Sequence, residues 1–393
     1  MVGASSAIIE TNQGYLSPES GHKLLPILLE SMKADSLMAT DEYRFALLSY
    51  LECCSAIFDY EQADLIYEQF LNNIDDYVSQ KEEKLGWTLL GRQFRTNYSF
   101  DTIQWSAKGC VLEIYYLLKQ CHELNPSLRL ALLRQQEFGY IYNCVNLDAN
   151  EIGAMIDEIN SLSTLLYPNL FHLREMVEVY HLSARIAENP SISLLPRTQL
   201  HRKIKEGVVN PIESFPLVWF MSQVAYANNS LKESHSLMEE AQRRALDIIA
   251  QQSIPTRVNS LYIVQCLIQR EVKQYGVVST ESDDSEELIM LDSLLSQIDT
   301  TIIGNRCKVS AISQYSLNRT GTSVSLPTAK IGRKIIQYVK NDSYKPYRYE
   351  CLVQGAKAMF NGGLAEESID LMNQIFEDAK SYPRAAARAC RSL

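Results

Sequence analysis

Apolar residues recur at helical spacing along most of the chain. Steps of three and four separate the apolar residues of one early segment, Tyr43, Ala46, Leu47, Tyr50, Leu51 and Cys54. The same spacing relates those of the next, Ala63, Ile66, Tyr67, Phe70, Leu71 and Ile74. Such spacing places the apolar side chains on one face of an α-helix. Only Phe58 to Tyr60 lie between these segments, which leaves room for a short turn and predicts an antiparallel helix hairpin.

The same reading predicts helices along nearly the whole chain and almost no strand. Further helices are expected at 23–33, 85–95, 101–122, 127–145, 149–166, 170–187, 197–206, 215–228, 231–251, 256–275, 284–299, 305–316, 327–341, 346–361 and 364–380. Pro126 can begin a helix without losing a hydrogen bond, and Asp148 can cap the helix that follows it. Two polar stretches, 276–287 and 316–327, are rich in serine, threonine, aspartate or asparagine and are expected to be exposed connectors.

Three segments resemble tetratricopeptide repeats, which are helix pairs of about 34 residues. In the first, Asp59-Tyr60-Glu61-Gln62-Ala63 is similar to the family's turn and small-residue position, although Leu51 and Phe70 stand where glycine and alanine are usual. The second runs from Val218 to Ala241, with Ser234 at the small position. The third has Gly363 at the turn and Ser368 at the small position.

This resemblance implies an all-α fold, an α-solenoid of antiparallel helix pairs wound into a right-handed, tetratricopeptide-like superhelix. The other reading is a non-repetitive helical domain with small residues at its helix crossings. Under either reading Ala63, Ser234 and Ser368 are expected at close helix contacts. The expected organisation is a flexible N-terminus at 1–19, a helical array at 20–190, and a second array at 191–393 that could be continuous with the first.

Composition favours a soluble, intracellular protein, cytoplasmic or nuclear. The 393 residues are 46% hydrophobic, the net charge is -10 and the pI is near 5.3, which disfavours direct binding of nucleic acid. The first residues lack the pattern of a secretory signal, and no run reaches the roughly 18 to 20 apolar residues needed to span a bilayer. Nine dispersed cysteines fit reduced thiols better than a disulfide framework.

Motifs for catalysis, metals and cofactors are not found. The six histidines are dispersed, and there is no Cys-x-x-Cys pair, glycine-rich phosphate loop or Gly-x-Ser-x-Gly elbow. Acidic pairs are typical of solvated helix faces. We therefore expect no catalytic residue, no metal and no cofactor.

Candidate partner-binding residues come from two compositional clusters. Aromatic and arginine side chains, which are enriched at binding hot spots, gather at Trp87, Arg92, Arg95 and Trp105. The tryptophans could equally form a buried helix face. Basic side chains at Arg197, Arg202 and Lys205 could bind phosphate or an acidic partner, or could simply form a solvated helix face. A looser basic group, Arg333, Lys334, Lys340, Lys345 and Arg348, has the same two readings.

These observations favour a non-catalytic scaffold or adaptor that binds a protein or peptide partner through a helical array. The alternative is the ligand- or peptide-sensing region of a transcription regulator, which would need a partner to reach DNA. An all-helical enzyme such as a terpenoid synthase is opposed by the absence of paired aspartate-rich motifs.

Overall fold

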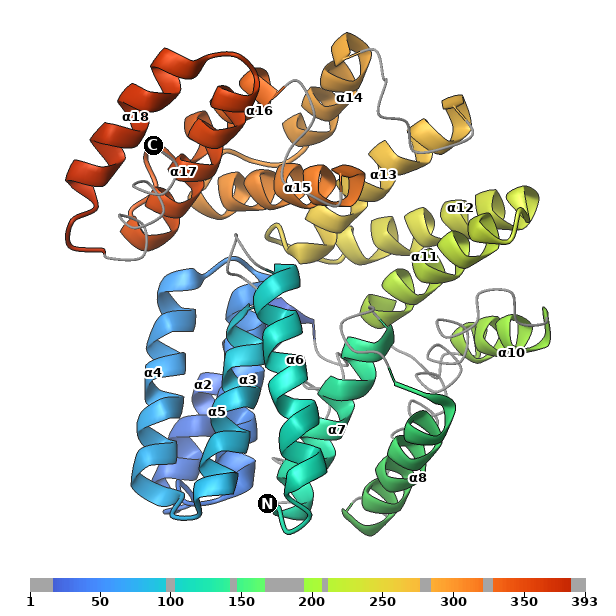
Figure 1. Ribbon diagram of the computed structural model, residues 1–393, viewed down its shortest axis with the longest axis vertical. Helices are drawn as coiled ribbons and strands as arrows, with labels where there is room; N and C mark the ends of the chain where they lie inside the picture. The colour runs from blue at the N-terminus through green and yellow to red at the C-terminus, as the bar shows by residue number, and fades with distance from the viewer. Residues whose placement is uncertain are drawn as a thin grey trace. The chain divides into compact units, whose positions relative to one another are not determined.

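The protein is described by a computed structural model that covers residues 17–96, 103–141, 147–166, 194–206, 211–275, 284–320 and 328–382. These residues form sixteen α-helices and contain no strand (Figure 1). In chain order, the helices are α2 (Pro18–Ala34), α3 (Asp41–Ala56), α4 (Tyr60–Tyr77), α5 (Lys81–Thr96), α6 (Ile103–Gln120), α7 (Pro126–Ile141), α8 (Ala149–Leu166), α10 (Leu194–Lys205), α11 (Pro211–Ala227), α12 (Leu231–Ile249), α13 (Arg257–Tyr275), α14 (Asp284–Ser296), α15 (Ile302–Thr320), α16 (Thr328–Val339), α17 (Lys345–Asn361) and α18 (Ala365–Asp378). The all-α prediction is confirmed for the described residues, and the helix expected at 170–187 lies outside them.

The starts of several helices follow from local capping chemistry. The Asp148 carboxylate accepts hydrogen bonds from the backbone amides of Asn150 at 2.8 Å and Glu151 at 2.9 Å. The Glu151 carboxylate in turn accepts from the Asp148 amide, which completes a capping box at the start of α8. Pro126 begins α7 as predicted.

Each predicted polar connector overlaps a helix at one end. Helix α14 begins at Asp284, where the helix at 284–299 was predicted to begin, so only the end of the connector 276–287 is wrong. Helix α15 continues to Thr320, beyond its predicted end at 316 and inside the connector 316–327. At the start of α14 the acidic residues suit the positive end of a helix dipole, so the composition that indicated a loop also favours a helix N-terminus.

Contacts divide the chain into two compact units. Unit 1 comprises Met1–Ser55 and Gln62–Arg244, and unit 2 comprises Ala56–Glu61 and Ala245–Leu393. This division falls within α12, whereas the sequence placed a domain boundary at 190/191. That boundary stays a prediction.

Unit 1 is built from helices that pack on their neighbours in the chain. Helices α5, α6, α7 and α8 pack in succession, and α5 also packs on α7. The core of unit 1 includes Trp87 of α5 and Phe70 and Ala63 of α4, each no more than 1% exposed. A buried face of this extent supplies most of the stability of such helices, because isolated helices of this length are marginal in water.

Unit 2 repeats this arrangement, with α13 packed on α14 and α15, and with α15, α16, α17 and α18 packed in succession. Helices α16 and α17 approach closely at two glycines: a Cβ on Gly332 would lie 2.4 Å from the carbonyl oxygen of Gly355. The hydroxyl of Ser368 on α18 donates to the carbonyl of Ala356 on α17 at 2.7 Å. Ala63, Ser234 and Ser368 are all buried, which both readings of the sequence predict.

A buried arginine in unit 2 forms hydrogen bonds to two carboxylates and a backbone carbonyl. Arg306 on α15 is 2% exposed and makes paired hydrogen bonds to the carboxylate of Asp342, both at 2.7 Å. It also donates to the carboxylate of Glu61 at 2.6 and 2.7 Å and to the carbonyl of Phe58 at 2.8 Å. Because two carboxylates and a carbonyl satisfy the guanidinium, its burial is compensated.

None of the helices within the described ranges is both long enough and apolar enough to cross a lipid bilayer.

Candidate partner-binding surface

The aromatic and arginine cluster divides between core and surface. Trp87 is 1% exposed, and its ring packs against Phe45 at 5.0 Å and Phe70 at 6.3 Å between ring centroids. Its assignment to partner binding is therefore wrong, because helix packing leaves no indole surface for a partner. Trp105 lies in α6, but its side chain is outside the described ones.

The two arginines of this cluster lie on the surface in ion pairs that link neighbouring helices. Arg92 contacts Glu113 of α6 at 3.1 Å, and Arg95 contacts Asp64 of α4 at 3.1 Å. The Arg95 guanidinium also lies over the Tyr67 ring, 4.6 Å from its centroid. Both arginine side chains are 45% exposed. Exposed pairs of this kind contribute at most about 1 kcal/mol, so a partner carboxylate could replace them at little cost.

Of the predicted binding clusters, the basic cluster on α10 is the one that the structure places beside a hollow. Arg202 and Lys205 are exposed in the last turns of α10, and Arg202 pairs with Glu206 at 3.6 Å. Lys205 lines an open hollow of about 430 Å³ whose other wall is α12. Lys205 has no ion-pair partner among the described residues. The Arg197 side chain, the third member of the predicted cluster, is outside the described ones.

Helix α12 contributes residues that the sequence reasoning missed. Ser236, Glu239, Glu240, Arg243 and Arg244 line the hollow together with Lys205. The signal available in the sequence was the pair Arg243-Arg244, four residues after Glu239-Glu240, which places two cations and two anions on one helix face. The sequence alone did not show that this face lies opposite α10.

A chain of polar contacts organises the base of the hollow. His201 Nε2 lies 2.8 Å from Glu240, and the other Glu240 oxygen accepts from Arg244 at 2.8 and 3.1 Å. Arg244 also donates to the buried hydroxyl of Ser214 at 3.2 Å. Burial raises the pKa of the Glu240 carboxyl, but hydrogen bonds from Arg244 and His201 outweigh it, and the net pKa is below its usual range. Glu240 is therefore ionised and neutralised within the chain.

The electrostatic result is a hollow that favours an anion. The lining residues comprise three cations, Lys205, Arg243 and Arg244, and two anions, Glu239 and Glu240, so the lining carries one net positive charge. Carboxylate and phosphate groups are the partners that arginine and lysine recognise most strongly.

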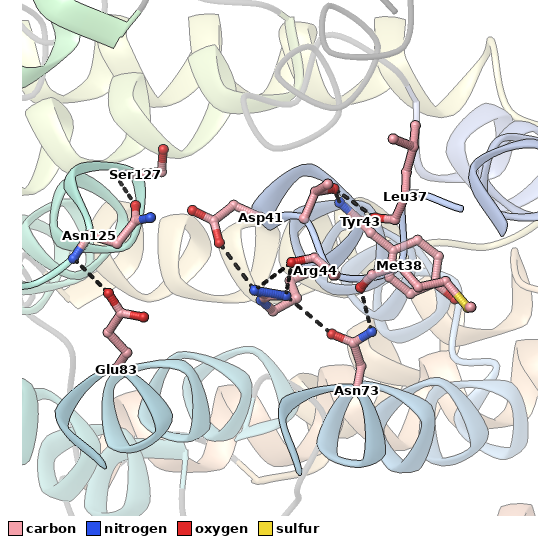
Figure 2. Close-up of polar contacts among 11 residues, drawn as sticks. Leu37, Met38, Asp41, Tyr43, Arg44, Asn73, Glu83, Asn125 and Ser127 are labelled. Atoms are coloured by element: carbon pink, nitrogen blue, oxygen red, sulfur yellow. Dashed lines mark hydrogen bonds and ion pairs between the residues drawn. The ribbon is translucent and has the colours of Figure 1, made fainter. Parts of the chain in front are cut away.

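A second polar cluster lies at the loop between α2 and α3 (Figure 2). Arg44 is 5% exposed; it donates twice to the carbonyl of Ala39 at 3.1 Å and contacts Asp41 at 3.4 Å. Asn73 of α4 accepts from Arg44 at 3.5 Å and donates to the carbonyl of Met38 at 2.8 Å. These bonds hold the loop against α4.

Figure 2 also shows that the starts of three helices lie together. Asp41 begins α3, Glu83 lies in the first turn of α5, and Asn125 directly precedes α7. The Glu83 carboxylate accepts from the Asn125 amide at 3.3 Å, and the Asn125 side chain caps α7 by accepting from the Ser127 amide at 2.8 Å. Burial raises the pKa of Asp41 more than the nearby Arg44 lowers it. The cluster joins these helix ends, so we assign it a structural role.

Comparison with known proteins gives no family for this chain. No protein-family model matches it, and no curated protein matches it significantly. Within the described ranges, no group of three or more histidine, cysteine, aspartate or glutamate side chains is placed to hold a metal ion.

Proposed function

We propose that the chain is a non-catalytic scaffold or adaptor, a tetratricopeptide-like helical array that binds an acidic segment of a protein partner. The observation that carries the proposal is the hollow between α10 and α12. There the predicted residue Lys205 lies with Arg243 and Arg244 of a second helix around a space large enough for several side chains.

Two features support a solenoid of antiparallel helix pairs. Helix α5 packs on α7 as well as on α6, and α13 packs on α15 as well as on α14, so helices contact their second neighbours as in stacked repeats. The starts of α3, α5 and α7 also lie together, which fits alternate helices running in the same direction. Arrays of this kind present extended surfaces for peptides and helices.

The chemistry of the hollow indicates the class of partner. Its lining has one more cation than anions in a chain whose net charge is -10, so the protein as a whole repels acidic partners while this surface attracts them. Such an arrangement favours a local contact with aspartate, glutamate or phosphorylated side chains.

The test is quantitative partner capture from the cells that express the protein, with the full-length chain as bait. The double variant Arg202→Glu, Lys205→Glu reverses two charges at the hollow. The matched control Lys23→Glu, Lys380→Glu reverses two lysines whose side chains are 69% and 62% exposed, on or just after other helices. All four residues are on the surface, so both variants should melt close to the wild type.

We expect at least one protein to be retained equally by wild type and control and at least about tenfold less by the hollow variant. Retention of the same proteins by all three baits would remove the hollow as the binding site. Failure of the wild type to retain any protein would contradict the scaffold proposal.

A further inference from the structure

Helix α16 carries two opposed stripes along its length. Ile331, Ile335 and Val339 are buried, each no more than 3% exposed. Lys330, Arg333 and Lys334 are cationic and follow the spacing of the other helix face, and Lys340 directly follows the helix. Of these, Lys330, Arg333 and Lys340 are exposed, and Lys334 is partly so. The helix therefore presents a cationic stripe to the surface of unit 2.

This stripe forms one wall of a groove. The groove has a volume of about 430 Å³, and its opposite wall is α14. Leu288 lies at its base at 8% exposed, whereas Ile289 is 69% exposed, as much as any large apolar side chain in the described ranges. The α14 wall thus has two apolar residues and one acidic residue, Asp292, and the α16 wall is mainly cationic.

The acidic residues near the groove are already matched. Asp292 of α14 is ion-paired with Lys334 across the groove. Arg333 makes two contacts of 3.0 Å with Glu367, and both side chains are more than half exposed. Lys330 has no ion-pair partner in the described ranges. A carboxylate arriving from outside would meet Lys330 directly and could exchange with Glu367 for Arg333, because exposed pairs are weak.

The cationic wall is held firmly in place. Gly332, between Lys330 and Arg333, is in close contact with Gly355 of α17, where even an added methyl group would collide with the backbone. Side chains on a helix fixed in this way are positioned before a partner arrives, which lowers the entropic cost of binding.

We propose that the groove between α14 and α16 binds an acidic amphipathic segment of another protein, with carboxylates on Lys330 and Arg333 and an apolar side chain against Ile289. The apolar wall beside the cations favours a peptide over nucleic acid, which needs an extended basic surface. This goes beyond the proposed function, because the groove is a second surface, in unit 2, and requires an apolar residue that the polar hollow of unit 1 does not.

The test is fluorescence anisotropy on the full-length protein with three labelled probes. The first is a designed helical peptide with glutamates on one face and leucines beside them. The second replaces its leucines by serine, and the third is a single-stranded oligonucleotide. The groove should bind the first probe and neither of the other two.

Matched variants locate the binding. Lys330→Glu lies in the groove, and Lys340→Glu makes the same charge change on an exposed lysine near the other end of the stripe, outside the groove lining. Ile289→Ser removes the apolar wall, and Ile302→Ser makes the same change at a 45% exposed isoleucine of α15. Lys205→Glu reports any binding at the hollow of unit 1.

We expect Lys330→Glu and Ile289→Ser each to weaken binding of the leucine peptide by about tenfold or more, and the other three variants to change it less than about twofold. Equal effects of Lys330→Glu and Lys340→Glu, no binding of this peptide, equal binding of the serine peptide, or preference for the oligonucleotide would each overturn the proposal. Loss of binding in Lys205→Glu alone would place the peptide at the hollow and also refute the groove.

Discussion

The carboxyl group of Glu137 makes the stability of unit 1 depend on pH. This α7 side chain is fully buried, and neither carboxylate oxygen accepts a hydrogen bond. Among the described residues, its ion-pair partner is Arg134, one turn earlier, at 3.6 Å. Burial raises the pKa of Glu137 from 4.5 to about 7, although Arg134 opposes the rise.

The sign and size of the effect follow from this pKa. A raised pKa means that the folded state holds the proton more tightly than the unfolded state, so the carboxyl group costs nothing while both states are protonated. The cost grows as the pH rises from 4.5 through about 7. Each pH unit of that interval is worth about 1.4 kcal/mol, so the ionised carboxylate lowers the unfolding free energy by about 3 kcal/mol at high pH.

Glu137→Gln keeps the shape of the side chain and removes its charge. Urea unfolding followed by far-ultraviolet circular dichroism should give the variant nearly the wild-type unfolding free energy at about pH 4, where both states are mostly protonated. At about pH 8 the variant should be more stable by roughly 3 kcal/mol. Glu68→Gln, at an exposed glutamate of α4, controls for the loss of a negative charge. A difference that is the same at both pH values, or a variant that is less stable at the higher pH, would refute the reasoning.

Three further predictions concern packing and the buried arginine. Ala63→Leu should overpack a fully buried helix contact and lower the unfolding free energy by about 1 to 3 kcal/mol, measured by urea unfolding; an unchanged midpoint would contradict the packing. Gly332→Ala should lower the melting temperature, because its methyl group would meet backbone at 2.4 Å, whereas Gly153→Ala, with nothing within 4 Å, should raise it slightly. Arg306→Met should cost about 3 to 5 kcal/mol by leaving buried Asp342 unpaired, whereas Arg333→Met at an exposed pair should cost less than about 1 kcal/mol; equal costs would mean that Arg306 is not buried as described.

The helices could be predicted from the sequence because their signals are local. Apolar spacing, the proline that begins α7 and the aspartate that caps α8 all act within a few residues, and the structure follows them closely. The errors came where one composition serves two structures. The start of a helix at Asp284 was predicted, but the polar connector was extended to 287 over its first turn, although acidic residues also favour the start of a helix.

The candidate site was only partly predictable because it depends on contacts between distant helices. The exposure of Arg202 and Lys205 follows from their helix, but the opposing Arg243 and Arg244 become relevant only when α12 lies beside α10. Trp87 was mispredicted for the same reason, because an aromatic residue near arginines in the sequence fits both a binding interface and a buried core. The packing of Phe45 and Phe70 around its ring decides for the core.

The central claim is that the α10–α12 hollow binds acidic side chains of a protein partner, and charge reversal on both sides of the contact tests it most directly. Once the captured partner's acidic segment is known, its affinity is measured by titration calorimetry against the wild type and against Arg202→Glu, Lys205→Glu. The hollow variant should bind the native segment at least about tenfold more weakly and should regain most of that affinity with a segment whose acidic residues are changed to lysine. Equal affinity of the wild type and the hollow variant for the native segment, or no recovery with the lysine segment, would contradict the claim.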